Sequence, residues 1–170
     1  MISDAYRALN RQLHETNQTY GTSGSLYGEF IANLCRTNDL RTVLDYGCGK
    51  GTLAAGLSGV EVQEYDPAVP GKDYLPDVRA ADLVACTDVL EHIEPEHLYA
   101  VLGMLRYFTR KALFIAVHCG PAIKVLADGR NAHLIQMPPR WWNDKLWDAA
   151  FDLNYFQVVP RGFVAVYDPK

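Results

Sequence analysis

The sequence lacks the features that mark several large classes of protein. Its four cysteines, spread over 170 residues, include no C-x-x-C pair, which argues against a disulfide framework and against a cysteine zinc site. The longest apolar run, 112–117, is far shorter than the roughly 20 residues that a membrane-spanning helix needs. The first residues contain charged side chains and no apolar leader segment, so we expect a cytoplasmic protein without a membrane partner.

An excess of positive charge is also missing. The formal net charge is −4 and the sequence pI is about 5.7, which argues against extensive nucleic-acid binding, because such binding usually needs a basic face. The apolar content of 49% is enough for a full hydrophobic core. We expect one domain over residues 1–170, with helices in 1–40 and an α/β core in 41–170.

The most informative segment runs from Thr42 to Thr52 and reads TVLDYGCGKGT. A short strand-like run leads to Asp45. Three glycines then follow at alternate positions: Gly47, Gly49 and Gly51. Glycines after a strand let the backbone turn sharply and let a ligand approach the main chain. About 20 residues further on, Asp66 ends a second strand-like run, at the place where nucleotide-binding α/β folds hold ribose hydroxyls.

The spacing of these glycines excludes two phosphate-binding motifs. A dinucleotide fingerprint, G-x-G-x-x-G, needs its third glycine at position 52, which is Thr52. A phosphate-binding P-loop needs Ser or Thr after the lysine, but Gly51 follows Lys50, and its first glycine would fall on Leu44. A nicotinamide-dependent oxidoreductase and a P-loop nucleotidase are therefore both poor interpretations.

The pattern D-x-G-x-G-x-G instead resembles motif I of class I S-adenosylmethionine-dependent methyltransferases. Residues 64–67 (EYDP) resemble the second motif of that family, and 82–92 (DLVACTDVLEH) resemble its fourth strand and the following loop. The resemblance covers 40–118 well and the remainder more loosely; the DGRNAH segment and the paired tryptophans near the end are similar to small phage or bacterial methyltransferases. It implies S-adenosylmethionine as cofactor and a Rossmann-like, mostly parallel α/β sheet with a C-terminal antiparallel hairpin.

The resemblance also implies which residues contact the cofactor. Asp66 would bind the ribose, Asp45 would lie toward the amino group, and the glycines would bring the main chain close to the ligand. The expected cofactor-binding residues are Asp45, Gly47, Cys48, Gly49, Gly51, Asp66, Pro67, Thr87 and Asp88.

The segment between Asp66 and Asp82 departs from the family pattern. A third strand and its helix normally fit here, but this short segment contains three prolines and a glycine, which oppose both. We therefore expect edge strand 3 to be shortened or missing. The usual acidic contact to adenine would then be lost, and Asp77 is the nearest substitute.

The rest of the chain follows helical and strand patterns. We expect helices over 3–15, 25–37, 95–111 and 139–151, and a short helix that ends near 57. We expect strands over 42–46, 60–65, 82–87, 112–118, 156–160 and 163–167.

Catalytic residues are harder to predict, because methyl transfer from a sulfonium depends mainly on alignment of the reactants. Glu91, His92 and His133 are the candidates, since two lie in the loop after a strand and the third lies in the DGRNAH segment. The run D-x-x-E-H is similar to the E-x-x-E-H of metal-dependent small-RNA 2′-O-methyltransferases, with His118 or His133 as the further ligand. Methyltransferases without a metal share the Glu-His pair, so we assign no metal ligand.

The sequence therefore predicts an S-adenosylmethionine-dependent methyltransferase that acts on a small-molecule or nucleotide-like acceptor. Two alternatives stay open: a metal-dependent RNA 2′-O-methyltransferase-like enzyme, and a non-catalytic S-adenosylmethionine-binding protein. Sequences typical of DNA amino-methyltransferases and cytosine C5-methyltransferases are missing, because position 86–89 reads CTDV and Cys119 precedes its proline.

Overall fold

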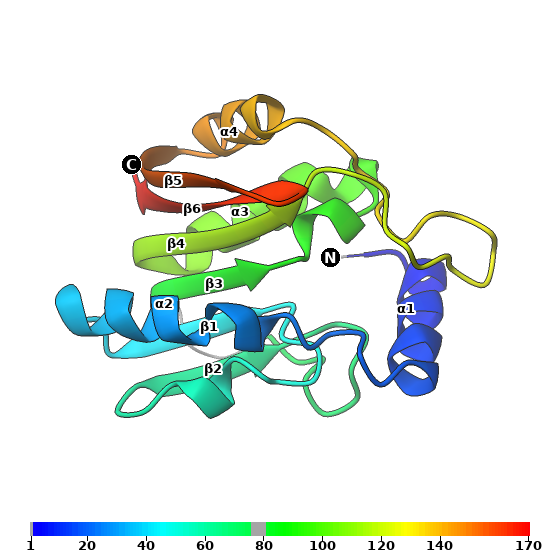
Figure 1. The fold of residues 1–170 in the computed structure, drawn as a ribbon, viewed down its shortest axis with the longest axis horizontal. Helices are drawn as coiled ribbons and strands as arrows, with labels where there is room; N and C mark the ends of the chain where they lie inside the picture. Colours follow the sequence, from blue (N-terminus) through cyan, green and yellow to red (C-terminus); the bar gives the residue numbers. More distant parts are fainter. Residues whose placement is uncertain (1, 76–80) are drawn as a thin grey trace.

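The computed structural model describes residues 2–75 and 81–170, which form a six-stranded sheet with helices on both faces (Figure 1). The strand order is β2-β1-β3-β4-β6-β5. The strands are β1 (Thr42–Tyr46), β2 (Glu61–Tyr65), β3 (Ala81–Thr87), β4 (Thr109–His118), β5 (Phe151–Val159) and β6 (Gly162–Pro169). The first four pair in parallel, whereas β6 is antiparallel to both β4 and β5. The predicted mostly parallel sheet with an antiparallel C-terminal hairpin is thus confirmed.

The described residues contain no strand beyond β2 at this edge of the sheet. After β2 the described chain forms turns that include Pro67, Pro70 and Gly71, and the next described strand is β3, which lies between β1 and β4. The expected loss of the third strand is confirmed for the described part of this segment. Asp77, the expected substitute for the adenine contact, lies outside the described residues.

The described ranges contain four α-helices beside the sheet. They are α1 (Asp4–Thr16), α2 (Gly24–Thr37), α3 (Leu98–Phe108) and α4 (Pro139–Asp148), with short 3₁₀ turns η1 (Ala54–Gly56), η2 (Leu90–His92) and η3 (Pro95–His97). The hydroxyl of Ser3 caps α1, because its Oγ accepts a hydrogen bond from the Tyr6 backbone N–H at 3.2 Å. The sequence therefore located the start of this helix correctly.

Three predicted helices are shorter than expected. Helix α3 ends at Phe108, before the expected end at 111, and β4 begins at Thr109. The segment after the glycine turn forms only η1, and α2 packs closely on it: a Cβ on Gly24 would lie 2.9 Å from Leu53 Cβ. The last helix ends at Asp148, and Ala150 then adopts a positive φ of 63°. This turn starts β5 at Phe151, a residue that the sequence had placed in the helix.

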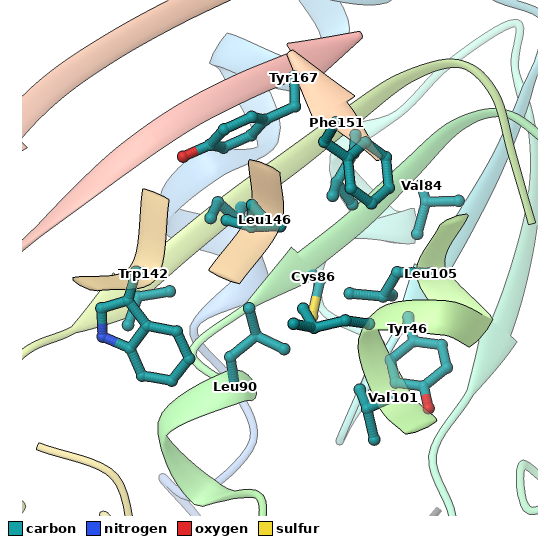
Figure 2. Close-up of a cluster of buried hydrophobic side chains, with 14 of the residues drawn as sticks. Tyr46, Val84, Cys86, Leu90, Val101, Leu105, Trp142, Leu146, Phe151 and Tyr167 are labelled. Carbon is teal, nitrogen blue, oxygen red and sulfur yellow. The ribbon is translucent and has the colours of Figure 1, made fainter. Parts of the chain in front are cut away.

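The core consists of two layers, one on each face of the sheet. Along β4, Phe114 packs with α2, whereas its neighbours Leu113 and Ile115 pack with α3 and α4, as the two-residue period of a strand requires. In the α3–α4 layer, the side chains of Trp142 and Leu146 from α4 lie over the sheet (Figure 2). Helix α1 and the 119–138 segment lie beyond the carboxyl ends of the parallel strands (Figure 1).

None of the helices in the described ranges is long and apolar enough to cross a membrane.

Candidate functional site

A cavity of about 480 Å³ opens at the carboxyl ends of the parallel strands. Ligands bind at this edge in open α/β sheets, and the volume lies in the usual range for small-molecule sites. The loops after β1, β2 and β3 form its floor, and α1 and the 119–133 segment form its other walls. Seven of the nine expected cofactor residues line it: Gly47, Cys48, Gly49, Asp66, Pro67, Thr87 and Asp88.

The glycine turn after β1 is shaped by close packing on both sides. Gly47 and Gly49 adopt φ angles of 78° and 51°, which favour glycine. A Cβ on Gly47 would lie 2.3 Å from Val89 Cγ2, and one on Gly49 would lie 2.6 Å from the Gly21 carbonyl oxygen. No side chain fits at either position, because Val89 and Gly21 fill the space, and the two glycines line the cavity with their main chain.

The other two expected cofactor residues lie behind the cavity wall. A Cβ on Gly51 would lie 2.0 Å from Glu64 Oε1, so this glycine makes room for the ion pair of Glu64 with Lys72. Asp45 is 1% exposed, and its Oδ2 has no hydrogen-bond partner in the described ranges. Burial, followed by the nearby charge of Glu64, raises the pKa of Asp45 to about 7.

Asp66 follows β2, and its carboxylate is fixed by the main chain. Oδ2 accepts the Gly49 N–H at 3.0 Å and Oδ1 accepts the Ala68 N–H at 2.9 Å. Each carboxylate oxygen can accept more than one hydrogen bond, so both remain available to hydroxyl donors. The main chain of the glycine turn and the carboxylate of Asp66 thus line the same cavity.

The segment after α1 closes over the glycine turn. The Lys50 ammonium donates hydrogen bonds to the carbonyl oxygens of His14, Asn17 and Tyr20, at 3.2, 3.1 and 3.0 Å. The Lys50 backbone N–H donates to the Gly21 carbonyl oxygen at 2.8 Å. A cation bound to carbonyls at a helix C-terminus is favourable, so Lys50 holds α1 to the floor of the cavity.

Helix α1 contributes residues that sequence reasoning missed. Tyr6, Asn10 and His14 occur at four-residue spacing, which places them on one face of the helix, and all three line the cavity. The Tyr20 hydroxyl donates to Asn10 Oδ1 at 2.9 Å. His14 Nε2 lies 3.9 Å from Asp66 Oδ2, while burial lowers the pKa of His14. The four-residue spacing of these polar and aromatic side chains along the helix was the only signal in the sequence that they share one face.

The three predicted catalytic residues come together on the wall formed by η2 and the DGRNAH segment. One nitrogen each from His92 and His133 and one carboxylate oxygen of Glu91 lie within 4.8 Å of one another. The two imidazole rings are perpendicular, with centroids 4.8 Å apart. His92 and His133 line the cavity, and Glu91 is fully buried behind them.

Backbone carbonyls orient both imidazoles. His92 Nδ1 lies 2.7 Å from the Ala132 carbonyl oxygen, and His133 Nδ1 lies 2.7 Å from the Gly120 carbonyl oxygen. A carbonyl oxygen only accepts hydrogen bonds, so each Nδ1 carries the proton and each Nε2 keeps a lone pair when the ring is neutral. Burial, helped by the neighbouring His133, lowers the pKa of His92 to about 3, and burial also lowers the pKa of His133.

Glu91 is held by only one of its oxygens. Oε1 accepts the His118 backbone N–H at 2.8 Å, whereas Oε2 is buried and has no partner in the described part of the chain. Burial, and then the nearby Asp88 carboxylate, raise the pKa of Glu91 well above its usual value. The wall therefore contains two imidazole rings, each with a free Nε2 lone pair when neutral, and a carboxylate oxygen that makes no hydrogen bond in the described ranges.

Searches for related proteins return matches in structure only. No protein-family model matches the chain, and no curated protein matches it in sequence. A 1,6-didemethyltoxoflavin-N1-methyltransferase from Burkholderia thailandensis, with bound 1,6-didemethyltoxoflavin and S-adenosylhomocysteine, matches with a TM-score of 0.76 at 16% identity, over 98% of this chain and 89% of that one. The DhpI–SAH complex matches with a TM-score of 0.63 at 20% identity, over 97% and 93%.

The small RNA methyltransferase HEN1 also matches, with a TM-score of 0.62 at 14% identity, and this chain spans 25% of it. The fold of the chain is therefore that of class I S-adenosylmethionine-dependent methyltransferases. Function has to be argued from the site, because one fold serves many functions.

Proposed function

We propose that this protein is an S-adenosylmethionine-dependent methyltransferase that acts on a small-molecule or nucleotide-like acceptor. The strongest support is that the D-x-G-x-G-x-G turn and the Asp66 carboxylate contact each other and line the same cavity. The bare main chain of Gly47 and Gly49 suits close approach of a ligand, and Asp66 suits a pair of ribose hydroxyls. Structural neighbours that were solved with S-adenosylhomocysteine agree with this choice of cofactor.

The residues that would hold the cofactor are those that line the floor: Gly47, Cys48, Gly49, Asp66, Pro67, Thr87 and Asp88. When bound, S-adenosylmethionine supplies an activated methyl group on a sulfonium. Asp45 and Gly51 support the same turn from behind it. The Lys50 contacts hold the segment after α1 against this floor, which limits the access of water.

His92, His133 and Glu91 form the part of the wall that would act on the acceptor. Both imidazoles stay neutral at neutral pH because burial opposes their charged form, so each has a lone pair at Nε2. Such a lone pair can accept a proton from an acceptor or bind a cation. The acidic composition of the chain disfavours a long RNA as acceptor.

A turnover assay tests the proposal. The purified chain is incubated with S-adenosylmethionine and panels of hydroxyl- and amine-bearing small molecules, nucleotides and short RNAs, and release of S-adenosylhomocysteine is measured. Turnover of a small molecule or nucleotide supports the proposal. Turnover of RNA ends alone would favour the RNA 2′-O-methyltransferase alternative. Binding of both cofactor forms without turnover of any acceptor would favour the non-catalytic alternative.

A further inference from the structure

The wall formed by Glu91, His92 and His133 contains a carboxylate oxygen that has no hydrogen-bond partner in the described ranges. One ring nitrogen of each histidine and one carboxylate oxygen of Glu91 lie within 4.8 Å of one another, and no N–H or O–H donor in the described ranges satisfies Glu91 Oε2. A buried polar atom without a partner is costly, by roughly 1–3 kcal/mol. A cation bound between the three side chains would give this oxygen a partner.

The geometry points to a divalent transition-metal site made of Glu91, His92 and His133. The Nδ1–H groups of both rings donate to backbone carbonyls, which is the arrangement that fixes metal-binding histidines and leaves Nε2 as the ligand atom. Glu91 is fixed in the same way, because Oε1 accepts the His118 N–H and Oε2 stays available. This inference changes the sequence-based expectation that no metal ligand is present.

The spacing of the three atoms suits an open site that tightens on binding. A tetrahedral ion about 2.1 Å from each ligand needs them roughly 3.4 Å apart, so the present limit of 4.8 Å has to shrink by about 1.4 Å. Rotation of the imidazole rings about their hydrogen bonds supplies a movement of this size. Three protein ligands leave at least one coordination position, which lies on the side where His92 and His133 line the cavity.

The ligand types define the class of ion. Two imidazoles with one carboxylate suit Zn²⁺, Fe²⁺, Co²⁺ or Mn²⁺, whereas Mg²⁺ and Ca²⁺ prefer oxygen ligands.

The site also has a consequence for the acceptor, and this consequence rests on the proposed function. An acceptor hydroxyl that occupies the open position would have its pKa lowered, release its proton to water and keep the electron pair on oxygen. An oxygen-bearing acceptor is thus favoured over an amine. Metal binding itself does not depend on the cofactor, so its test is separate from the test of methyl transfer.

Calorimetry on the full chain tests the site. The protein is treated with a chelator, freed of it, and titrated at pH 7.5 with Zn²⁺, Mn²⁺ or Mg²⁺ in turn, without cofactor. We expect one saturable Zn²⁺ site per chain and much weaker Mg²⁺ binding. Absence of a saturable Zn²⁺ site overturns the proposal, and Mg²⁺ binding as tight as that of Zn²⁺ overturns the assigned class of ion.

Three variants locate the site. Glu91→Gln, His92→Gln and His133→Gln should each weaken Zn²⁺ by roughly 100-fold or more, since even the loss of a group that only orients a ligand costs 10–100-fold. His14→Gln is the matched control, because His14 lines the same cavity but lies outside the cluster, and it should bind like the parent. Parental affinity in all three variants would place the metal elsewhere and contradict the proposal.

A measurement on the parent chain covers the case in which a variant does not fold. In protein with ¹⁵N-labelled histidine, Zn²⁺ should shift the Nε2 resonances of two rings while their Nδ1 atoms stay protonated. Unchanged histidine resonances at saturating Zn²⁺ would refute the assignment.

Discussion

Asp66→Ala is the substitution with the most informative expected effects, because the Asp66 carboxylate has two roles. It is 7% exposed and accepts hydrogen bonds from the Gly49 and Ala68 N–H groups. In the proposed complex it also accepts hydrogen bonds from the ribose hydroxyls. Its removal should therefore weaken the cofactor and also destabilise the free protein.

The size of both effects follows from these contacts. Hydrogen bonds to a charged acceptor contribute about 1.5–3 kcal/mol, so the affinity for S-adenosylhomocysteine should fall about 10- to 100-fold. The two N–H groups that lose their acceptor should lower the free energy of unfolding by about 1–3 kcal/mol, and the melting temperature by roughly 2–10 °C. Asp66→Asn keeps one carbonyl oxygen as acceptor and should lose less stability than the Ala variant.

Calorimetry with S-adenosylhomocysteine and thermal unfolding measure the two effects. Glu61→Ala is a matched control, since Glu61 lies on β2, the strand that precedes Asp66, is exposed and does not line the cavity. It should leave both the affinity and the melting temperature near the parental values. An unchanged dissociation constant in folded Asp66→Ala would remove this residue from the binding site and refute the reasoning.

Three further substitutions probe the turn and the buried titratable groups. Gly49→Ala should detach the segment after α1 from the glycine turn, because the new Cβ would lie 2.6 Å from the Gly21 main chain. Proteolysis within residues 17–24 should then be faster than in the parent. Cleavage at the parental rate would contradict this expectation. The pKa of Asp45 is raised from 3.8 to about 7 in the folded state, so the folded protein binds more protons than the unfolded chain between these values, and the free energy of unfolding falls as pH rises. Asp45→Asn should remove this fall, which urea unfolding curves from pH 4 to 8 would measure. The pKa of His92 is lowered from 6.5 to about 3 in the folded state, so the unfolded chain binds more protons in this range, and the free energy of unfolding falls as pH falls through it. In His92→Gln the free energy of unfolding should depend less on pH. A pH profile identical to that of the parent would argue against a buried neutral ring.

The sequence predicts the central part of the fold because local signals and tertiary structure agree there. The apolar run of β3 is fully buried, as expected for a strand that is covered on both faces, and Ser3 marks the start of α1. The prolines after Asp66 correctly indicated the loss of a strand in the described part of that segment. In each case the residues that determine the local structure are neighbours in the sequence.

The walls of the cavity were less predictable because their causes lie in the main chain and in distant segments. The face of α1 with Tyr6, Asn10 and His14 looks like a partly polar helix face until the strands that it covers are known. The carbonyl oxygens of Gly120 and Ala132 fix the tautomers of His133 and His92, but backbone acceptors leave no trace in the residue types. The DGRNAH segment was expected to contain a catalytic candidate, His133, whereas the orientation of two histidines by backbone carbonyls of the 119–138 segment is visible only in the structure.

The central claim is that the cavity binds S-adenosylmethionine, and calorimetry on the parent chain tests it most directly. The protein is titrated separately with S-adenosylmethionine, S-adenosylhomocysteine, NAD and ATP under one set of conditions. The account predicts one site per chain for the first two ligands, with NAD and ATP bound at least about 10-fold more weakly, a difference of about 1.4 kcal/mol. Tighter binding of NAD or ATP, or no binding of either S-adenosyl compound, would contradict it.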